Sequence, residues 1–477
     1  MLKVAGVFLG LVLVFALVRG FSTIRETVFT TATPTVAKLL PEGSFGKQEP
    51  PQPTPSPTTR PTPVAPFPVI PNGYLEKALA RAYAGTTVVV DGHFMDIDAV
   101  KFQRSMRPFE ETTGITVEYI GGVDFRDTIS LRVDAGEAPD IADFSQFDLL
   151  PQFVSQGMVV DPTTFISPAW LQQQYQQSWL DMSRIEGQTA GVWHRFRGNS
   201  LVWYPKADFE AQGYTVPSTW AELQALMDQI VAGGDTPWCI GIESGQATGW
   251  PAADWLADFV LRTTSLESYD RWVTGDLPFS SPEIKHAAEV MAEIWFEDTY
   301  VYSGTARIPY TFFGDSPAPM FADPPQCWLH RQGPLIVGYF PVEAEFGVDY
   351  GFFLLPEIDP AFGRPMLVTG DLMVMFNDRP EVRALMEYFT TPNSVTGWLE
   401  AGGALAAQQT ATPEMYGSEL EAEMARWALQ ATSFRYDASV SMPPEVDESF
   451  WKGMTRWISG RADLDTVLAE IDASWPR

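Results

Sequence analysis

Short β-branched runs alternate with helical patterns of apolar residues from residue 86 onward. Residues 86–90 (TTVVV) are typical of a buried strand, and apolar residues recur at helical spacing over 102–109. Pro108 lies inside that helical pattern, so we expect a kink or an early end there. Gly114 is a helix stop, and the residues that follow it, 115–120, predict the next strand.

The same alternation continues through a second helix and a third strand. Phe125, Ile129 and Val133 mark the helix, Gly136 follows it, and the strand begins at 139–141. Strands joined by helices through short connections predict a parallel, doubly wound sheet.

A second strand-and-helix region follows residue 200. Residues 219–222 (TWAE) form a capping box, the helix runs to Gly233, and 237–242 predict a strand. Another amphipathic helix is expected over 464–471. A chain of 477 residues is too long for one hydrophobic core. We therefore predict that the folded part of the chain forms two α/β lobes. Ligands of open α/β sheets bind beyond the carboxyl ends of the strands, so two facing lobes predict a cleft.

The first residues predict attachment to a membrane. An uncharged apolar run extends from Val4 to Val18, which suits a signal segment, and no small-x-small cleavage pattern follows closely. We therefore expect an uncleaved apolar signal anchor over 1–22, with a cleaved signal peptide as the alternative.

A proline-rich segment separates this anchor from the folded body. Residues 34–71 contain twelve prolines among Thr, Ser and Gln, and proline lacks an N–H and fixes φ. We expect a Pro/Thr-rich stalk over 30–75 that is extended and semi-rigid. A plain interdomain linker is the alternative.

Composition excludes several classes of function. The chain carries 31 Lys and Arg against 60 Asp and Glu, a net charge of −29, which repels the phosphates of nucleic acid. Four His and two Cys leave little material for a metal site, and we expect neither a metal nor a cofactor. The sequence contains no complete catalytic motif, so we expect no enzyme. The sixty carboxylates nevertheless leave a glycosidase acid/base pair open.

The two cysteines, Cys239 and Cys327, are expected to pair. In a secreted chain, two buried cysteines form a disulfide more often than not. Two reduced core thiols are the alternative.

An ordered set of motifs resembles a known family. The set resembles bacterial extracellular sugar-binding proteins, the maltose-type solute-binding components (family 1) of ABC transporters, and in particular their α-glucoside-type branch. The resemblance extends over roughly residues 86–477 and rests on the segments 109–115, 139–141, 201–206, 217–223, 238–243, 249–251, 325–328, 369–371 and 450–454.

The resemblance implies a two-lobe periplasmic-binding-protein fold, type II-like, with hinge strands and an interlobe cleft. The chain would cross between the lobes near residues 204, 367 and 415. The expected parts are 86–204 (lobe 1, first part), 205–367 (lobe 2, first part), 368–415 (lobe 1, second part) and 416–477 (the C-terminal helical part of lobe 2).

The resemblance also implies a set of ligand contacts. Aromatic rings cover the apolar face of a sugar, while carboxylates, amides and guanidinium groups bind its hydroxyls. The expected contacts are Asp96, Phe144, Ser145, Gln146, Trp193, Arg195, Asn199, Trp250, Trp328 and Asp371. Each Trp has core packing as its alternative role, and Asp371 has helix capping or surface exposure.

The function implied is a membrane-tethered extracellular receptor, a monomer, that binds a sugar or oligosaccharide and delivers it to ABC permease subunits. The expected location is the outer face of a bacterial membrane, or outside the cell if the signal is cleaved. An extracellular glycoside hydrolase and a sugar sensor for a signalling partner are the alternatives.

Overall fold

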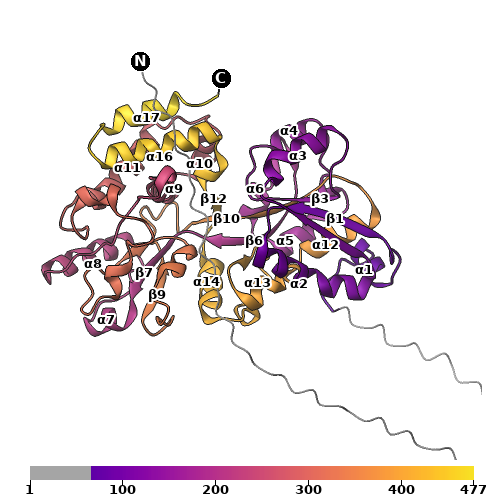
Figure 1. The fold of residues 1–477 in the computed structure, drawn as a ribbon, viewed down its shortest axis with the longest axis horizontal. Helices are drawn as coiled ribbons and strands as arrows, with labels where there is room; N and C mark the ends of the chain where they lie inside the picture. The colour runs from indigo at the N-terminus through magenta and orange to yellow at the C-terminus, as the bar shows by residue number, and fades with distance from the viewer. Residues whose placement is uncertain (1–65, 477) are drawn as a thin grey trace, which may run out of the picture. The chain divides into compact units, whose positions relative to one another are not determined.

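The computed structural model describes residues 66–476, in which two lobes are joined by crossing segments (Figure 1). The predicted anchor, 1–22, and most of the predicted stalk lie outside the described residues. Among residues 66–476, no helix combines the length and the apolar character needed to cross a membrane.

The first lobe is built on a seven-stranded sheet with the order β11-β6-β10-β3-β1-β2, in which β12 pairs with the start of β10. Its strands are β1 (Thr87–Gly92), β2 (Thr116–Gly121), β3 (Ile141–Phe144), β6 (Val192–Gly198), β10 (Met366–Met375), β11 (Leu405–Ala406) and β12 (Phe434–Tyr436). Strand β1 is parallel to β2 and β3, as predicted. Strand β10 is antiparallel to β3 and β6, so the sheet is mixed rather than wholly parallel.

Helices pack around this sheet and share its hydrophobic core. They are α1 (Tyr74–Leu79), α2 (Asp96–Thr113), α3 (Phe125–Asp134), α4 (Leu150–Ser155), α5 (Pro168–Gln174), α6 (Gln177–Met182), α12 (Pro380–Phe389), α13 (Thr396–Ala401) and α14 (Glu419–Gln430). A hairpin of β4 (Arg184–Ile185) and β5 (Gln188–Thr189) adjoins α6.

The second lobe is mostly helical around a three-stranded antiparallel sheet of order β8-β7-β9. The strands are β7 (Leu201–Pro205), β8 (His330–Arg331) and β9 (Tyr350–Leu354). The helices are α7 (Lys206–Ala211), α8 (Trp220–Ala232), α9 (Trp250–Thr263), α10 (Leu266–Val273), α11 (Pro282–Trp295), α15 (Ala438–Ser441), α16 (Pro444–Ile458) and α17 (Leu464–Asp472).

Several local predictions are confirmed. Helix α8 begins with the Thr219–Glu222 capping box. Helix α2 ends at Gly114, whose φ of 73° is the left-handed conformation that glycine adopts without strain. Pro108 does not end α2, because the carbonyl left without a partner belongs to the exposed Arg104, where water can bind it.

The strand predicted over 237–242 is not formed. Trp238 makes only isolated bridges to Val301 and Leu329. Pro237 has no N–H to donate, and its carbonyl accepts from the N–H groups of Trp328 and Leu329 in an irregular segment. The predicted Cys239–Cys327 disulfide joins these two segments, with its Cα atoms 5.6 Å apart.

Two boundaries differ from the sequence expectation. Phe67 is buried against Tyr388, at a ring distance of 5.0 Å, and α1 packs on α12, so the folded body begins before residue 75. Helix α14 packs beside the sheet of the first lobe, because it contacts β11 and shares a small pocket with Phe196 of β6 and Phe434 of β12. We therefore propose that the chain crosses to the second lobe after Tyr436 instead of near residue 415.

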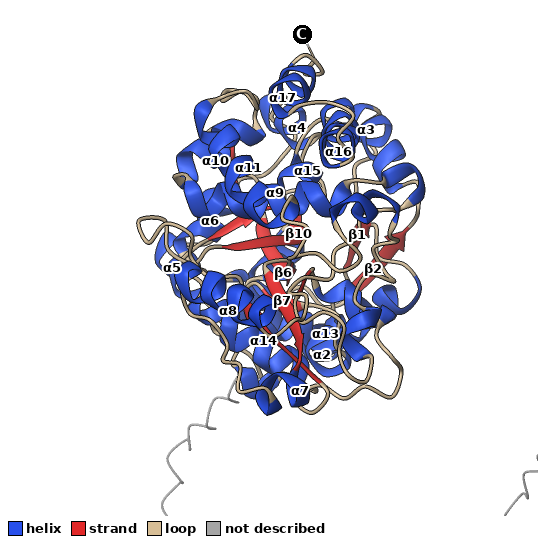
Figure 2. Cartoon of the chain, turned by 90° about the vertical axis from the view of Figure 1, so that its left-hand side faces the viewer, coloured by secondary structure: helices blue, strands red, loops and turns tan. Residues whose placement is uncertain are grey.

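The crossing segments lie side by side and are bound to each other. Strand β6 leads through Ser200 directly into β7, and β10 begins at the same level (Figure 2). The hydroxyl of Ser200 accepts a hydrogen bond from the N–H of Leu367 in β10, at 2.8 Å, and donates to Asp258 of α9, at 2.7 Å. All three residues are fully buried, so α9 of the second lobe is bound to both crossing strands.

Candidate functional site: a cleft between the lobes

A pocket of about 390 Å³ lies between the two lobes and is named here the interlobe pocket. The first lobe contributes Arg126 and Gln146. The second lobe contributes Gln246, Ala247, Ser439, Val440, Met442, Pro444, Asp447, Glu448 and Trp451. The lining thus combines one indole ring, two amides, two carboxylates, a hydroxyl and a guanidinium group.

A second pocket of about 320 Å³ opens on the first lobe alone and is named here the first-lobe pocket. Its residues are His93, Met95, Gly122, Val123, Phe125, Arg126, Phe144, Ser145, Gln146, Asp148 and Leu149. They lie at the end of β3, in the loops that follow β1, β2 and β3, and at the start of α3, which places the pocket at the carboxyl ends of these parallel strands, as expected for such sheets. Arg126 and Gln146 line both pockets, so the two adjoin.

Helix α16 positions the second-lobe wall of the interlobe pocket. Asp447 and Trp451 are four residues apart and therefore share one face of the helix. The helix packs tightly against the residues before α9, because a side chain at Gly249 would meet the carbonyl oxygen of Trp451 at 2.1 Å. Gly249 also has a φ of 108°, so no other residue fits this contact without strain.

Two polar atoms in this wall lack partners. Within residues 66–476, neither the indole N–H of Trp451 nor the Oδ1 atom of Asp447 makes a hydrogen bond, although both atoms are buried. Burial, and to a lesser degree the charge of Asp437, raise the pKa of Asp447 to about 7, against the effect of a hydrogen bond from Ser439. A buried donor and acceptor without partners favour a polar ligand or bound water.

A cluster of charged side chains lies beneath the first-lobe pocket, and His93 is its member that lines the pocket. His93 Nδ1 lies 3.3 Å from Asp143 Oδ2, and His93 Nε2 lies 3.3 Å from Asp371 Oδ1. Burial disfavours the imidazolium form, but the charge and hydrogen bond of Asp143 and the charge of Asp371 outweigh it and raise the pKa of His93 to about 9. Burial and the charge of Asp371 raise the pKa of Asp143 to about 6, against the effect of His93.

These three side chains are also of metal-ligating types, with ligand atoms within 4.8 Å of one another. The two nitrogens of His93 face different carboxylates. The arrangement is that of an imidazolium bridging two carboxylates.

Arg195 balances the charge of this cluster from below. Its Nε atom lies 2.7 Å from Asp371 Oδ2, and its guanidinium group lies between the rings of Phe94 and Trp398, 4.4 and 4.5 Å from their centres. Only 1% of Arg195 is exposed. Arg195 and Asp371 therefore hold His93 in place but do not line either cleft pocket.

The other expected contacts divide into three groups. Phe144, Ser145 and Gln146 line the first-lobe pocket. Asp96 is exposed at the first turn of α2, beside the pocket residue Met95. Asn199 is partly buried between the lobes, where its N–H donates to the carbonyl of Leu367, and it lines neither pocket.

The three tryptophans that were expected to contact the ligand line neither of the two pockets. Trp193 is buried against Trp179, whose carbonyl accepts from its indole N–H at 2.7 Å. Trp328 is 2% exposed and packs against Tyr214 at 5.1 Å. Trp250 remains partly exposed at the start of α9 and packs on Phe313, but it lines neither pocket. We no longer propose Trp193 and Trp328 as ligand contacts.

Sequence reasoning missed the residues that do line the cleft, chiefly His93, Arg126, Asp447 and Trp451. Position in the sequence could have suggested two of them, since His93 follows a strand and Arg126 opens the helix after another. No signal in the sequence distinguishes Trp451 from the other tryptophans of the C-terminal helices.

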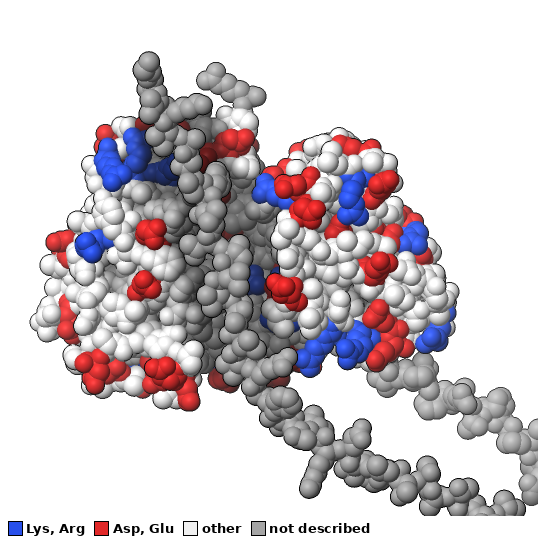
Figure 3. Space-filling view, viewed as in Figure 1, with Lys and Arg blue, Asp and Glu red and all other residues white. Residues whose placement is uncertain are grey.

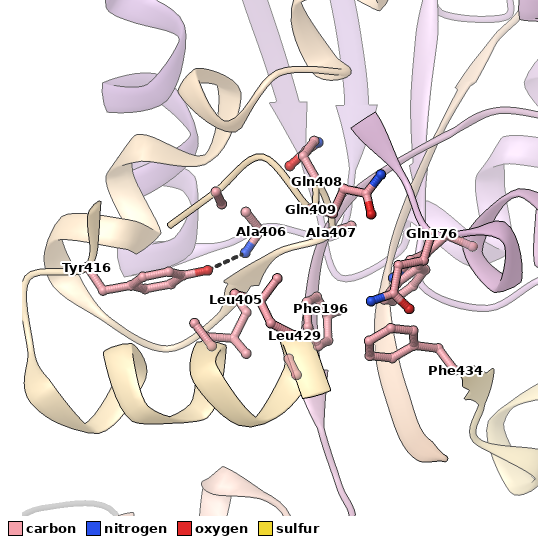
Figure 4. A pocket seen from close by; sticks show the side chains of 14 residues that line it. Gln176, Phe196, Leu405, Ala406, Ala407, Gln408, Gln409, Tyr416, Leu429 and Phe434 are labelled. Atoms are coloured by element: carbon pink, nitrogen blue, oxygen red, sulfur yellow. Dashed lines mark hydrogen bonds between the residues drawn. The ribbon is translucent and has the colours of Figure 1, made fainter. Parts of the chain in front are cut away.

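Other hollows lie outside these two pockets. The pocket in Figure 4 lies beside α14 and β11, and its volume of about 30 Å³ is suited to a water molecule rather than a sugar. A hollow of about 560 Å³ lies between α6 and α10. Acidic and basic side chains are interspersed over both lobes on the face shown in Figure 3.

Comparison with known proteins gives a consistent result. A family model described as bacterial extracellular solute-binding protein matches residues 96–395. The osmoprotective compounds-binding protein GgtB of Synechocystis sp. is 40% identical over 380 residues, which cover 79% of this chain and 89% of that protein. The alpha-glucosides-binding periplasmic protein AglE of Rhizobium meliloti is 34% identical over 403 residues, which cover 82% and 87%.

The fold is shared with a solved structure of low sequence identity. The bacterial solute receptor AcbH, described as preferring β-D-galactopyranose, superimposes with a TM-score of 0.70 at 16% identity. The match covers 82% of this chain and 98% of AcbH.

Proposed function

This chain belongs to the bacterial extracellular solute-binding proteins, and on that premise we propose that it is the receptor of an ABC transporter for a sugar, of the α-glucoside class. It binds the sugar between its lobes, outside the cytoplasmic membrane, and delivers it unchanged to the permease subunits.

The observation that carries this proposal is the composition of the interlobe pocket. The ring of Trp451 offers an apolar face, and Gln146, Gln246, Asp447 and Arg126 offer donors and acceptors around it. Sugars present an apolar C–H face and a rim of hydroxyls, which such a lining complements. Two relatives, named for α-glucosides and for osmoprotective compounds, support a small polar ligand.

Contacts from both lobes explain how binding is signalled. Arg126 and Gln146 approach the ligand from the first lobe, while Trp451 and Asp447 approach it from the second. A ligand that touches both walls stabilises the closed arrangement over the open one, because only the closed arrangement makes all the contacts. The permease would then recognise the closed form.

The receptor is proposed to act as a monomer attached to the membrane by residues 1–22, with the proline-rich segment as a spacer. The apolar run and the twelve prolines support this arrangement. None of the relatives reported above is described as an enzyme, and we propose no catalytic activity.

Titration calorimetry with a panel of α-glucosides, other sugars, peptides and metal ions tests the proposal. Binding of at least one carbohydrate is expected. Binding only of peptides or metal ions would overturn it. Trp451→Ala should weaken sugar binding about tenfold or more, whereas Trp427→Ala, which removes a partly buried indole of α14 outside both pockets, should not.

Membrane attachment is tested separately by fractionating cells that express the full chain. The protein should remain with the membranes after a high-salt wash. Recovery of the shortened chain in the soluble fraction would show that the signal is cleaved.

A further inference from the structure

Five charged side chains are buried close to one another in the second lobe. They are Asp254, Asp258 and Arg262 of α9, Arg331 of β8 and Asp437, and none is more than 6% exposed. Asp258 lies between the two arginines, because its Oδ1 atom accepts from Arg262 and its Oδ2 atom accepts from Nε and Nη2 of Arg331, at 3.1 and 2.8 Å. Asp258 is therefore paired on both oxygens, and the other two carboxyl groups are not.

Those two carboxyl groups, Asp254 and Asp437, are hydrogen-bonded to each other. Ionised carboxylates only accept hydrogen bonds, so this contact requires a proton on one of them. Burial raises the pKa of Asp254 well above its ordinary value, and the charge of Asp437 acts in the same direction, against the charge of Arg331. The contact therefore has the form of a carboxylic acid bound to a carboxylate.

The charges of the cluster balance when one proton is present. Two guanidinium groups face three carboxyl groups, so one carboxyl group has to be neutral for the charges to cancel. An unbalanced charge is costly in an interior from which water is excluded. Asp447 of α16 interacts with the charge of Asp437, so its ionisation adds a negative charge and favours the proton on the pair.

The other groups around the cluster leave this balance unchanged. Burial raises the pKa of Tyr269, on α10, and lowers that of His330 to about 4, so both are neutral near pH 7. Arg435, in β12, is paired with Asp270. Helix α11, which also packs on α9, buries only apolar side chains, and the one charged residue of β10, Asp371, is paired in the first lobe.

Asp437 connects this pair to one wall of the interlobe pocket. Its Oδ1 atom accepts from the N–H of Ser439 at 3.0 Å, and its carbonyl accepts from the hydroxyl of Ser441 at 2.8 Å. Ser439, Val440 and Met442 line the pocket. The N–H of Asp437 donates to the carbonyl of Val368 in β10 at 2.8 Å, so this residue joins the pocket wall to a crossing strand.

We propose that Asp254 and Asp437 share one proton in the folded protein, and that Asp254 is thereby a positioning residue, which fixes the pocket wall 437–443 onto α9. Asp254 itself lines neither pocket. The shared proton does not depend on the function proposed above, whereas its effect on sugar binding does.

Asp254→Asn tests the shared proton, because its amide N–H donates to Asp437 without titrating. Infrared difference spectra at pH 6 should show that one protonated-carboxyl band of the wild-type protein is absent from the variant. Asp235→Asn, at an exposed aspartate of the same lobe, should retain that band. An unchanged band in Asp254→Asn would overturn the inference.

Urea unfolding gives a pH profile that a merely structural contact would not produce. The folded pair keeps a proton that the unfolded chain releases above the ordinary pKa of 3.8, so wild-type stability falls as the pH rises, until the pair itself ionises. Asp254→Asn lacks this dependence. Between pH 5 and pH 8 the ratio of its unfolding constant to that of the wild type should fall, by up to about tenfold per pH unit. Parallel profiles would overturn the inference.

Hydrogen exchange of the amides in 437–442 tests the positioning role. Asp254→Leu removes the donor and should accelerate exchange about tenfold or more at pH 7, whereas Asp254→Asn should stay within about twofold of the wild type. Equal rates in all three proteins, or equal acceleration in both variants, would overturn that role. The affinity for trehalose should fall in Asp254→Leu and be restored in Asp254→Asn. Binding of no sugar by the wild type would defeat the proposed function and leave the exchange rates to decide the inference.

Discussion

The Nε2 atom of His93 lies 3.3 Å from the Oδ1 atom of Asp371 and so joins the loop after β1 to β10, across the intervening strand β3. The other ring nitrogen of His93 forms an ion pair with Asp143 of β3, and Arg195 of β6 forms an ion pair with Asp371. Two cations and two anions from four segments thus balance one another beneath the first-lobe pocket. Such a cluster fixes the relative positions of the loops that line the pocket.

Replacing His93 should lower stability in a pH-dependent way. His93→Gln removes the cation that faces two buried carboxylates, at an expected cost of about 1–3 kcal/mol near pH 6. The folded-state pKa of about 9 exceeds the ordinary value of 6.5, so this stabilisation is present below pH 6.5 and is lost as the pH rises through 9. Urea unfolding between pH 6 and pH 10 should show the wild-type and variant curves converging.

His286→Gln is the matched control, because His286 is exposed on α11. Its stability should follow that of the wild-type protein at every pH. A constant difference between His93→Gln and wild type across this range would contradict the assignment of His93 as the titrating group.

Asp447 should destabilise the fold as it ionises. Its pKa is raised from 3.8 to about 7, so the unfolded chain loses its proton first, and the stability associated with this group falls between about pH 4 and pH 7. Asp447→Asn does not titrate. Its stability relative to wild type, measured by thermal unfolding without ligand, should therefore rise across that window. Glu448→Gln, which neutralises an exposed neighbour, serves as the control, and an equal trend in both variants would refute the prediction.

Ser200 should contribute to the stability of the crossing strands. Ser200→Ala removes the acceptor of the Leu367 N–H and a donor to Asp258, all fully buried, at an expected cost of about 1–3 kcal/mol. Chemical denaturation measures the loss, and Ser280→Ala, at an exposed serine, should have no effect beyond about 0.5 kcal/mol. If Ser200→Ala unfolds with the same free energy as the wild-type protein, water replaces the hydroxyl and the prediction is wrong.

The Cys239–Cys327 disulfide should stabilise the second lobe. It closes a separation of 88 residues, which corresponds to at most about 4–5 kcal/mol in the chain-entropy model. Reduction of the unfolded protein followed by refolding with blocked thiols should lower the melting temperature. Thiol labelling of the unfolded, unreduced chain should give no signal, and two labelled thiols would contradict the pairing.

Local sequence patterns predicted the elements whose stabilising groups are themselves local. The Thr219–Glu222 box and Gly114 determine where a helix begins and ends within a few residues, and both are confirmed. The parallel arrangement of β1, β2 and β3 follows from short connections between them. By contrast, β10 is inserted antiparallel from more than 220 residues further along the chain, which no local pattern reveals.

The candidate site was harder to predict for the same reason. Phe144, Ser145 and Gln146 were predicted from their place at the end of a strand, and they line the first-lobe pocket. Trp193, Trp328 and Trp451 share the same chemistry, and only their tertiary surroundings decide that two are core and one lines the cleft. Ordered motifs indicated the family because they reflect the fold of the whole chain rather than any single side chain.

Helix α9 packs against α16, which lines the interlobe pocket, and against β10, one of the crossing strands. At its amino end, Gly249 lies under the carbonyl of Trp451, and two turns further on Asp258 binds Ser200 between the crossing strands. We therefore expect α9 to transmit a displacement of the pocket wall to the crossing strands. Substitutions at its inner end would alter the equilibrium between open and closed forms without touching the sugar.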